Sequence, residues 1–350
     1  MSNLQRVIAK VFSSLPGNLI VKMTGGEPIT IEGRTLEPQL QMMAWNGRAA
    51  PPLSSLPAEV VQQAVKTQLA LLADVPSNGA DISELTIPGP DGNEIPARLY
   101  RPASQDPRHP LIVYFHMGGG VIGDMDTCHA WCAMLAQGAQ APVLSVDYRL
   151  APQHIFPAGL KDCIAAYKWG VANAQKFGAP AGKAAVGGDS MGGNFSAIIS
   201  QLMKREGGPM PALQLLIYPA IDISKHYPSK TAFANTFSLS QDTMDWFMQQ
   251  YLPENFDYKD LLVSPGQESD LTGLPPAVVV TAGHDPLVDE GDEYAARLKA
   301  AGVPVMHKRY DSLAHAFTAF TFISPGSRKA CQETAEMVHD TFAKAARVPA

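Results

Sequence analysis

One serine in the sequence has the surroundings of a catalytic nucleophile. Ser190 is the centre of Gly188-Asp189-Ser190-Met191-Gly192, a G-x-S-x-G motif. Glycines two positions before and after a serine let the backbone turn sharply, so that the side chain is presented between the end of a strand and the start of a helix. An apolar run, 184–187, precedes the motif, and a stretch that can be helical, 194–205, follows it. This order predicts that Ser190 is a nucleophile rather than an ordinary turn serine.

A glycine run upstream has the composition of an oxyanion hole. The predicted strand 111–115 leads directly into His116-Met117-Gly118-Gly119-Gly120. Attack on an ester carbonyl creates an oxyanion, and backbone N–H groups stabilise it only where the chain can approach closely, which glycine allows. A glycine run alone is more typical of a flexible turn, but its place after a strand and before the serine motif favours the functional interpretation. We predict that the N–H groups of Gly118, Gly119 and Met191 form the hole.

A serine nucleophile needs a histidine as general base and a carboxylate that orients the histidine. Around such a motif the chain order is serine, then acid, then histidine, which excludes the histidines before Ser190. His315 directly follows the last predicted strand and is the predicted base. Four later or nearby histidines are less suitable because they lie in an insertion, in a strand, in a helix or next to the predicted acid: His226, His307, His339 and His284.

The predicted acid follows the preceding strand. The apolar run 277–282 leads into Gly283-His284-Asp285-Pro286, where Asp285 occupies the first turn and the proline stiffens the loop. Asp289 and Glu290 lie about one helical turn further on and are the rivals. For both of these residues, an acid at the start of a helix or on the solvated surface is the favoured interpretation.

These residues need a scaffold of alternating strands and helices. A turn at Asp91-Gly92 predicts a hairpin. Helices are expected over 159–174 and 291–301, with Gly302 ending the second. Nearly continuous apolar runs predict strands covered on both faces, and their alternation with helices predicts an α/β fold with a mostly parallel sheet. The predicted strands are 82–88, 95–101, 111–116, 143–148, 184–189, 213–218, 277–282 and 305–310.

Two parts of the chain lack this alternation. Residues 1–80 contain no strong strand signal, and a helix is predicted over Ala58–Leu72. Residues 220–273 also lack one, but apolar residues repeat there at helical spacing after Ser240 and Asp242. We expect these two segments to form a helical cap over a catalytic core made of 81–219 and 274–350. An ordinary connection of that length without a function is uncommon.

Composition limits the partners. The net charge is −6 with a pI near 5.8, whereas a nucleic-acid-binding protein usually carries a basic stripe. Cys128, His129 and Cys132 have a spacing that can bind a metal, but no second pair with ligand spacing follows, so no metal is predicted and the four cysteines are expected to be thiols. Arg6 and Lys10 interrupt the apolar residues of the N-terminus, and no run approaches membrane-spanning length. We expect a cytoplasmic protein without membrane or nucleic-acid partners.

The sequence resembles the hormone-sensitive-lipase-like family of esterases, the bacterial family IV group, from about residue 80 onward. The resemblance implies the α/β-hydrolase fold, with a twisted eight-stranded sheet and a helical cap. It also implies hydrolysis of short- or medium-chain carboxylic esters without a cofactor, supports Asp285 as the acid, and gives His116 a supporting role in the oxyanion loop. It is carried by five ordered motifs: His116–Asp124, Asp147–Pro152, Gly188–Gly193, Asp285–Leu287 and His315–Phe317.

The sequence departs from the family pattern at four positions without losing a catalytic atom. Met117 and Met191 stand where the family usually has glycine and alanine, so the oxyanion loop and the pocket near the serine are expected to differ. Gln153 replaces a common glutamate and Ala316 a common glycine. These departures affect the expected substrate range more than the expected activity.

The predicted function is hydrolysis of a small-molecule ester through a Ser190–His315–Asp285 triad and an acyl-enzyme. A triad does not identify the bond that is cleaved, so an amidase or peptidase and a long-chain lipase are alternatives on the same fold. A ligand-binding protein is a further alternative, although related receptors have lost the histidine that is present here as His315. Final strands and helices in this architecture can pair between subunits, so a homodimer is compatible with the sequence.

Overall fold

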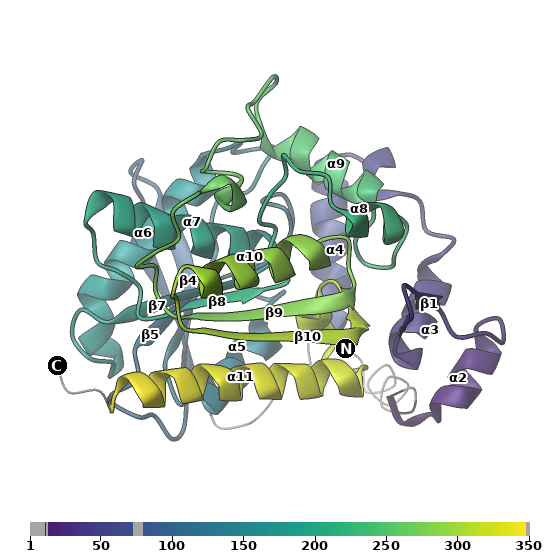
Figure 1. Ribbon diagram of the computed structural model, residues 1–350, viewed down its shortest axis with the longest axis horizontal. Coiled ribbons are helices and arrows are strands. Elements are labelled where there is room, and N and C mark those ends of the chain that lie inside the picture. Colours follow the sequence, from purple (N-terminus) through teal and green to yellow (C-terminus); the bar gives the residue numbers. More distant parts are fainter. Residues whose placement is uncertain (1–10, 12, 73–79, 348–350) are drawn as a thin grey trace.

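The computed structural model describes residues 11, 13–72 and 80–347. The N-terminal residues on which the expectation about a signal peptide rests, 1–10 and 12, lie outside this description. The described chain forms a central sheet with helices on both faces (Figure 1).

The sheet has eight strands in the order β10-β9-β8-β7-β5-β6-β4-β3. β3 and β4 form the predicted hairpin and pair antiparallel, as do β4 and β6, while all other neighbours are parallel. The predicted mostly parallel eight-stranded sheet is therefore confirmed. The strands are β3 Asp81–Pro88, β4 Glu94–Arg101, β5 Leu111–Phe115, β6 Val143–Val146, β7 Ala184–Asp189, β8 Gln214–Ile217, β9 Ala277–His284 and β10 Val305–Ala314.

The five strands β5 to β9 are buried along their whole length, which explains their continuous apolar sequence. Helices α5 and α11 pack together on one face of the sheet, and α6, α7 and α10 cover the other (Figure 1). Their bounds are α5 His129–Ala139, α6 Ala158–Asn173, α7 Met191–Glu206, α10 Val288–Ala300 and α11 Pro325–Ala345, with the short helices η2 Ala174–Phe177 and η4 Phe317–Phe320.

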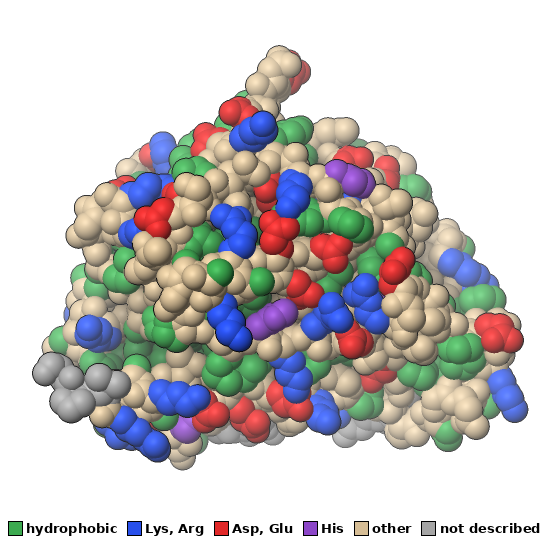
Figure 2. Space-filling view, in the orientation of Figure 1, with side chains coloured by type: hydrophobic (Ala, Val, Ile, Leu, Met, Phe, Trp, Pro, Cys, Tyr) green, Lys and Arg blue, Asp and Glu red, His purple; other side chains and the backbone are tan. Residues whose placement is uncertain are grey.

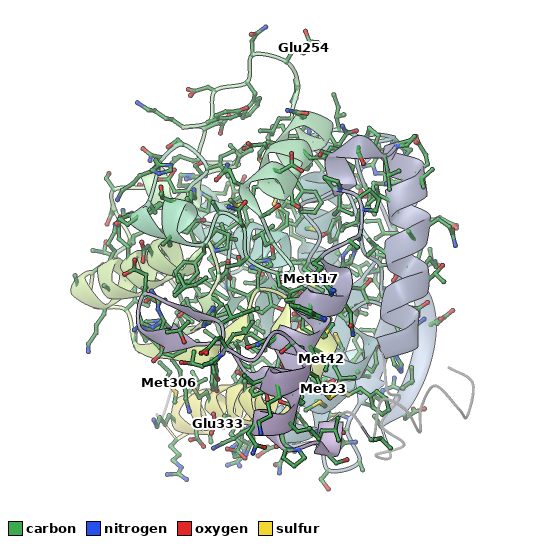
Figure 3. The ribbon with its side chains drawn as sticks, turned by 90° about the vertical axis from the view of Figure 1, so that its right-hand side faces the viewer. Met23, Met42, Met117, Glu254, Met306 and Glu333 are labelled. Atoms are coloured by element: carbon green, nitrogen blue, oxygen red, sulfur yellow. The ribbon has the colours of Figure 1, made fainter. Side chains whose placement is uncertain are left out.

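The N-terminal region is helical, as expected, and includes the predicted helix α4 at Ala58–Leu72. It also contains a short antiparallel pair, β1 Thr30–Ile31 with β2 Arg34–Thr35, that the sequence analysis did not predict. Viewed from the side, this region stands in front of the core, with Met23 and Met42 on its helices (Figure 3). The remaining elements are α2 Gly17–Met23, α3 Pro38–Gly47 and η1 Leu53–Ser55.

The segment 220–273 contains no strand, and every one of its residues is described. It holds α8 Pro228–Ala232, α9 Gln241–Tyr251 and η3 Pro265–Gln267. Ser240 caps α9 by accepting a hydrogen bond from the N–H of Thr243, as its sequence position indicated. The loop after α9 projects from the molecule, with Glu254 at its tip (Figure 3). Ser54 of η1 donates a 2.7 Å hydrogen bond to Asp242 of α9, so the N-terminal region and the insertion are in contact.

Charged side chains of both signs are mixed on the surface in view, and the cysteines are buried. Acidic and basic side chains are interspersed over the face in Figure 2, without a region of one charge. Among the described residues, no helix combines the length and apolarity needed to cross a bilayer. All four cysteines are buried thiols, and Cys128 Sγ lies 3.3 Å from the hydroxyl of Ser145.

Candidate active site

The turn between β7 and α7 holds Ser190 in a strained conformation. Ser190 has φ 54° and ψ −114°, a region that non-glycine residues rarely occupy. The flanking glycines are required by close packing, since a Cβ on Gly188 would lie 2.3 Å from the backbone of Gly192, and one on Gly192 would lie 1.9 Å from the carbonyl oxygen of Phe115. Strain of this kind at a strand-to-helix turn is the geometry of a nucleophile elbow.

The three residues predicted for a triad lie in one hydrogen-bonded line. The Ser190 hydroxyl is 3.0 Å from Nε2 of His315, and Nδ1 of the same ring is 2.7 Å from Oδ2 of Asp285. The other oxygen of Asp285 accepts a 2.8 Å hydrogen bond from the N–H of Leu287. A carboxylate at Nδ1 holds the proton on that nitrogen and leaves Nε2 to accept the serine proton. All three side chains are buried.

The rival acids lie elsewhere. Asp289 and Glu290 are in the first turn of α10, as expected for acids at a helix start. Asp289 accepts a hydrogen bond from the N–H of Ser229, and Glu290 is paired with Lys230, so neither contacts His315. Glu290 is fully buried, which its sequence position did not indicate.

The other histidines are also occupied or remote. His307 pairs with Asp292 at 2.9 Å, and His226 bonds to the hydroxyl of Thr231. His339 lies in α11, as predicted. His284 is buried beside Phe233, and burial lowers its pKa. None of these four histidines has a hydrogen bond to Ser190 or Asp285 among the described residues.

The glycine loop lies where its sequence position predicted. Gly118, Gly119 and Gly120 have φ values of +123°, +65° and +75°. A Cβ on Gly118 would lie 1.9 Å from the carbonyl oxygen of Ile122, and one on Gly119 would lie 2.4 Å from the ring of Phe247 in α9. Gly119, Ser190 and Met191 line the same cavity.

His116 is buried at the base of this loop. Its ring stacks on Tyr148 with centroids 4.3 Å apart, and its Nδ1 donates a 2.7 Å hydrogen bond to the carbonyl oxygen of Met117. Tyr148 in turn donates from its hydroxyl to the carbonyl oxygen of His116 at 2.8 Å. His116 therefore contacts the loop itself and not the serine hydroxyl or the triad histidine.

Helix α4 also holds the loop, a contact that the sequence analysis missed. The side-chain amide of Gln62 donates to the carbonyl oxygens of Val121 at 2.8 Å and Ala151 at 3.1 Å. The amide of Gln153, the residue that replaces the family's usual glutamate, donates back to Gln62 at 3.1 Å. No local pattern marks Gln62, because its partners are more than fifty residues away.

A buried carboxylate lies beneath the serine turn. Asp189 accepts hydrogen bonds from the hydroxyls of Tyr114 at 2.7 Å, Tyr218 at 2.9 Å and Thr318 at 3.0 Å. Burial raises the pKa of Asp189, and the three donors partly offset this effect. The ring of Tyr218 also packs against His315 with centroids 4.8 Å apart. Asp189 thus ties the serine strand to the segment that follows the histidine.

The backbone around His315 has one unusual conformation and one hydrogen bond to the insertion. Ala316 has φ +63°, in the left-handed region that glycine adopts more readily than alanine. Ser238, in the insertion, donates a 2.7 Å hydrogen bond to the carbonyl oxygen of His315. The sequence analysis did not identify Ser238.

A cavity of about 270 Å³ opens beside Ser190. Its apolar wall comes largely from the insertion and includes Leu239, Met244, Phe247 and Met248. Met191, buried at the start of α7, contributes to the wall next to the serine, as its departure from the family pattern suggested. Such a mostly apolar cavity beside a nucleophile fits a small organic substrate.

Comparison with known proteins identifies the family of this chain. A family model described as alpha/beta hydrolase fold matches residues 112–319. The chain belongs to the hormone-sensitive-lipase-like family of α/β-hydrolase-fold esterases. The prediction of family and fold is therefore confirmed.

Several members of this family are similar over most of their length. Carboxylic ester hydrolase LipN of Mycobacterium tuberculosis is 40% identical over 320 residues, which cover 89% of this chain and 84% of that protein. Ethyl acetate hydrolase of Pseudomonas putida is 36% identical over 269 residues, covering 76% and 85%. The crystal structure of an ester hydrolase from the Lake Arreo metagenome superposes with a TM-score of 0.83 at 40% identity, covering 88% of this chain and 99% of that one.

Proposed function

We propose that this carboxylic ester hydrolase uses Ser190 as nucleophile, His315 as general base and acid, and Asp285 as the carboxylate that orients the histidine. The observation that carries the proposal is the continuous line of hydrogen bonds, 3.0 Å from serine to histidine and 2.7 Å from histidine to aspartate. The family's relatives named as ester hydrolases support the same chemistry.

The reaction proceeds in two halves. His315 takes the proton of Ser190 as the Oγ–carbon bond forms, and the N–H groups of Gly118, Gly119 and Met191 stabilise the oxyanion. The alcohol leaves with the proton from His315, which gives the acyl-enzyme. Water then adds to the acyl carbon, giving its proton to His315, and Ser190 leaves with that proton. His116 supports the oxyanion loop and transfers no proton.

The proposed substrates are small-molecule esters with short or medium acyl chains. The limited cavity volume of about 270 Å³ and the bulky Phe247 and Met191 in its wall support this size range. Residues 1–80 and the insertion 220–273 together form the proposed cap. Their direct contact through Ser54 and Asp242, and the place of α9 over Gly119, support it. No cofactor takes part in the proposed steps. The cytoplasmic location and the homodimer stay predictions.

The test is hydrolysis of a series of p-nitrophenyl esters from acetate to palmitate by the wild type and by Ser190→Ala. We expect activity that peaks at short or medium chains and falls by several orders of magnitude in the variant. A maximum at palmitate would instead identify a long-chain lipase. A matched p-nitroanilide that is cleaved faster than the ester would identify an amidase, and tight binding without turnover would identify a ligand-binding protein.

A further inference from the structure

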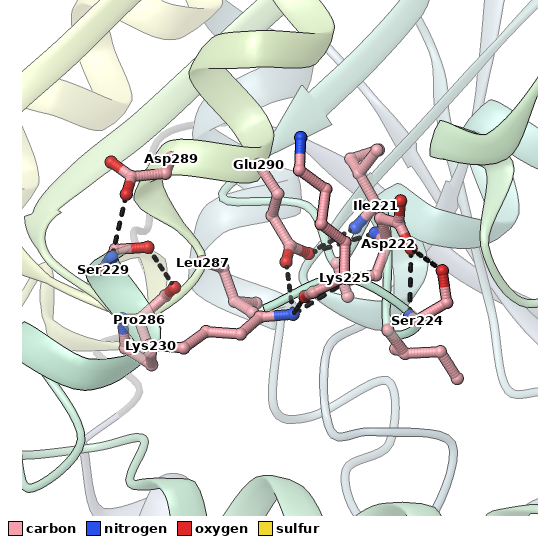
Figure 4. Close-up of polar contacts among 12 residues, drawn as sticks. Ile221, Asp222, Ser224, Lys225, Ser229, Lys230, Pro286, Leu287, Asp289 and Glu290 are labelled. Atoms are coloured by element: carbon pink, nitrogen blue, oxygen red, sulfur yellow. Dashed lines mark hydrogen bonds and ion pairs between the residues drawn. The ribbon is translucent and has the colours of Figure 1, made fainter. Parts of the chain in front are cut away.

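A buried ion pair lies next to the proposed substrate cavity and takes no part in the proposed reaction. Nζ of Lys230, in α8, is 2.9 Å from Oε2 of Glu290, in the first turn of α10. The side chain of Glu290 is fully buried, and that of Lys230 is only 10% exposed. Figure 4 shows both side chains directed toward the turn that follows β8.

Both charges hold the backbone of that turn, residues 221–225. Glu290 accepts hydrogen bonds from the N–H groups of Ile221 at 2.7 Å and Asp222 at 3.3 Å. Lys230 donates to the carbonyl oxygens of Asp222 at 2.9 Å and Lys225 at 3.0 Å (Figure 4). The turn is thus bound at its first two N–H groups and at two of its carbonyl groups by one pair of opposite charges.

The same turn forms part of the cavity wall. Ile223, Ser224 and Lys225 line the cavity beside Ser190, and so does Lys230. Immediately before the turn, the N–H of Ala220 donates a 3.2 Å hydrogen bond to the carbonyl oxygen of Ser190. A displacement of the turn therefore changes the wall that faces the substrate without removing any triad atom.

Helix α8 is also fixed to the loop that carries the proposed acid. Ser229 donates from its hydroxyl to the carbonyl oxygen of Pro286 at 2.7 Å, and its N–H donates to Asp289 at 2.8 Å (Figure 4). These two bonds fix the start of α8 to the catalytic core. Lys230, the residue after Ser229, then links α8 to the 221–225 turn.

Stability alone does not account for this pair. Removing two charges from water costs several kcal/mol for each ion, and an apolar pair of similar volume is often as stable or more stable. The best-attested use of a buried ionic pair is to select one arrangement among alternatives. Here that arrangement is the conformation of the five-residue turn, three residues of which line the cavity.

We propose that Lys230 and Glu290 are positioning residues. They fix the 221–225 turn, and with it part of the cavity wall, and thereby set which acyl chains the enzyme accepts. The proposal rests on the proposed esterase function. Acetate fills little of the cavity, whereas an octanoyl chain needs the wall along its length. Loss of the pair should therefore lower kcat/KM for an octanoate ester much more than kcat/KM for an acetate ester.

The test is Lys230→Met, which keeps the length and apolar stem of the side chain but removes its charge and its donors. We expect the ratio of kcat/KM for p-nitrophenyl octanoate to that for the acetate to fall about tenfold or more, mainly through KM, a change typical of losing part of a hydrophobic pocket. Lys308→Met removes an exposed pair with Glu333 and is the matched control, expected to leave the ratio unchanged.

A second variant separates positioning from the effect of an unpaired charge. Lys230→Met/Glu290→Gln no longer buries an uncompensated carboxylate, so its Tm should recover relative to Lys230→Met while the octanoate-to-acetate ratio stays low. An unchanged ratio in Lys230→Met, or a ratio restored in the double variant, would overturn the proposal. A wild type that hydrolyses no ester in the series would instead refute the proposed function.

Discussion

The oxyanion loop permits a sharp test, because adding a single methyl group to Gly119 conflicts with both the backbone and the insertion. Gly119 has φ +65°, where an L-residue costs about 1–2 kcal/mol. The Cβ of Gly119→Ala would lie 2.4 Å from Cγ of Phe247. Since carbon atoms pack at about 3.5–4.0 Å, the loop or the ring must move by more than about 1 Å.

A displacement of that size takes the N–H of residue 119 away from the oxyanion. Loss of one such donor typically lowers kcat by about 10²–10³, or about 3–4 kcal/mol. We expect this loss for Gly119→Ala, measured as kcat on p-nitrophenyl acetate. In a Phe247→Ala background the ring is absent, so the same change should cost at least about tenfold less.

Gly182→Ala is the matched control. Gly182 has φ +70°, and a Cβ there meets nothing within 4 Å, so this variant carries the backbone strain without the collision. Its kcat should remain close to that of the wild type, with a small decrease in Tm. Near-wild-type kcat in Gly119→Ala would refute the assignment of this loop to the oxyanion hole.

Three further results are expected. Asp285→Asn should lower kcat by about 10⁴ with little change in Tm, because the amide no longer selects the required tautomer of the triad histidine; a loss below about tenfold would contradict its role. Gln62→Ala should lower kcat by a larger factor than it raises KM, because the loop loses the hydrogen bond that Gln62 donates to Val121. Gln63→Ala, at an exposed position, is the control, and equal activity of the two variants would contradict this expectation. Burial raises the pKa of Glu290 and Lys230 lowers it, with a net rise. A raised carboxyl pKa means that the folded state holds the proton more tightly, so stability falls as pH rises from the ordinary carboxyl range through the folded pKa. Removing Lys230 strengthens this effect, so the decrease in Tm of Lys230→Met relative to the wild type should be larger at about pH 8 than at about pH 5. A decrease that does not depend on pH would contradict the presence of a buried, unpaired carboxylate in the variant.

The parts of the site that follow strand ends could be predicted from the sequence. Ser190, Asp285 and His315 each come directly after a strand, of which β7 and β9 are buried and β10 is largely exposed, and parallel strands bring their carboxyl ends to one edge of the sheet. Hydrophobic continuity and glycine spacing were therefore sufficient to predict the sheet and to bring these three residues together. Asp285 was predicted over Asp289 and Glu290 because it occupies the first turn after the strand, whereas the other two lie in the first turn of α10.

Contacts between distant segments could not be predicted in the same way. Gln62 reaches Val121 and Ala151, and Lys230 reaches Glu290, through side chains whose local sequence carries no signal. Glu290 has the sequence position of an ordinary helix-start acid, and its burial depends on how the insertion folds back over α10. The short pair β1 and β2 was missed because two-residue strands are too short to show alternation.

The most direct test of the account is the site of covalent modification by a p-nitrophenyl alkylphosphonate. Attack on phosphorus forms an Oγ–P bond, releases p-nitrophenolate and leaves the serine proton on His315, in the same arrangement as ester attack. Mass spectrometry of the inactivated protein should find one adduct per chain, on the peptide that contains Ser190, with one equivalent of p-nitrophenolate released. Inactivation with the adduct on another residue, or with no adduct, would contradict the assignment of Ser190 as the nucleophile.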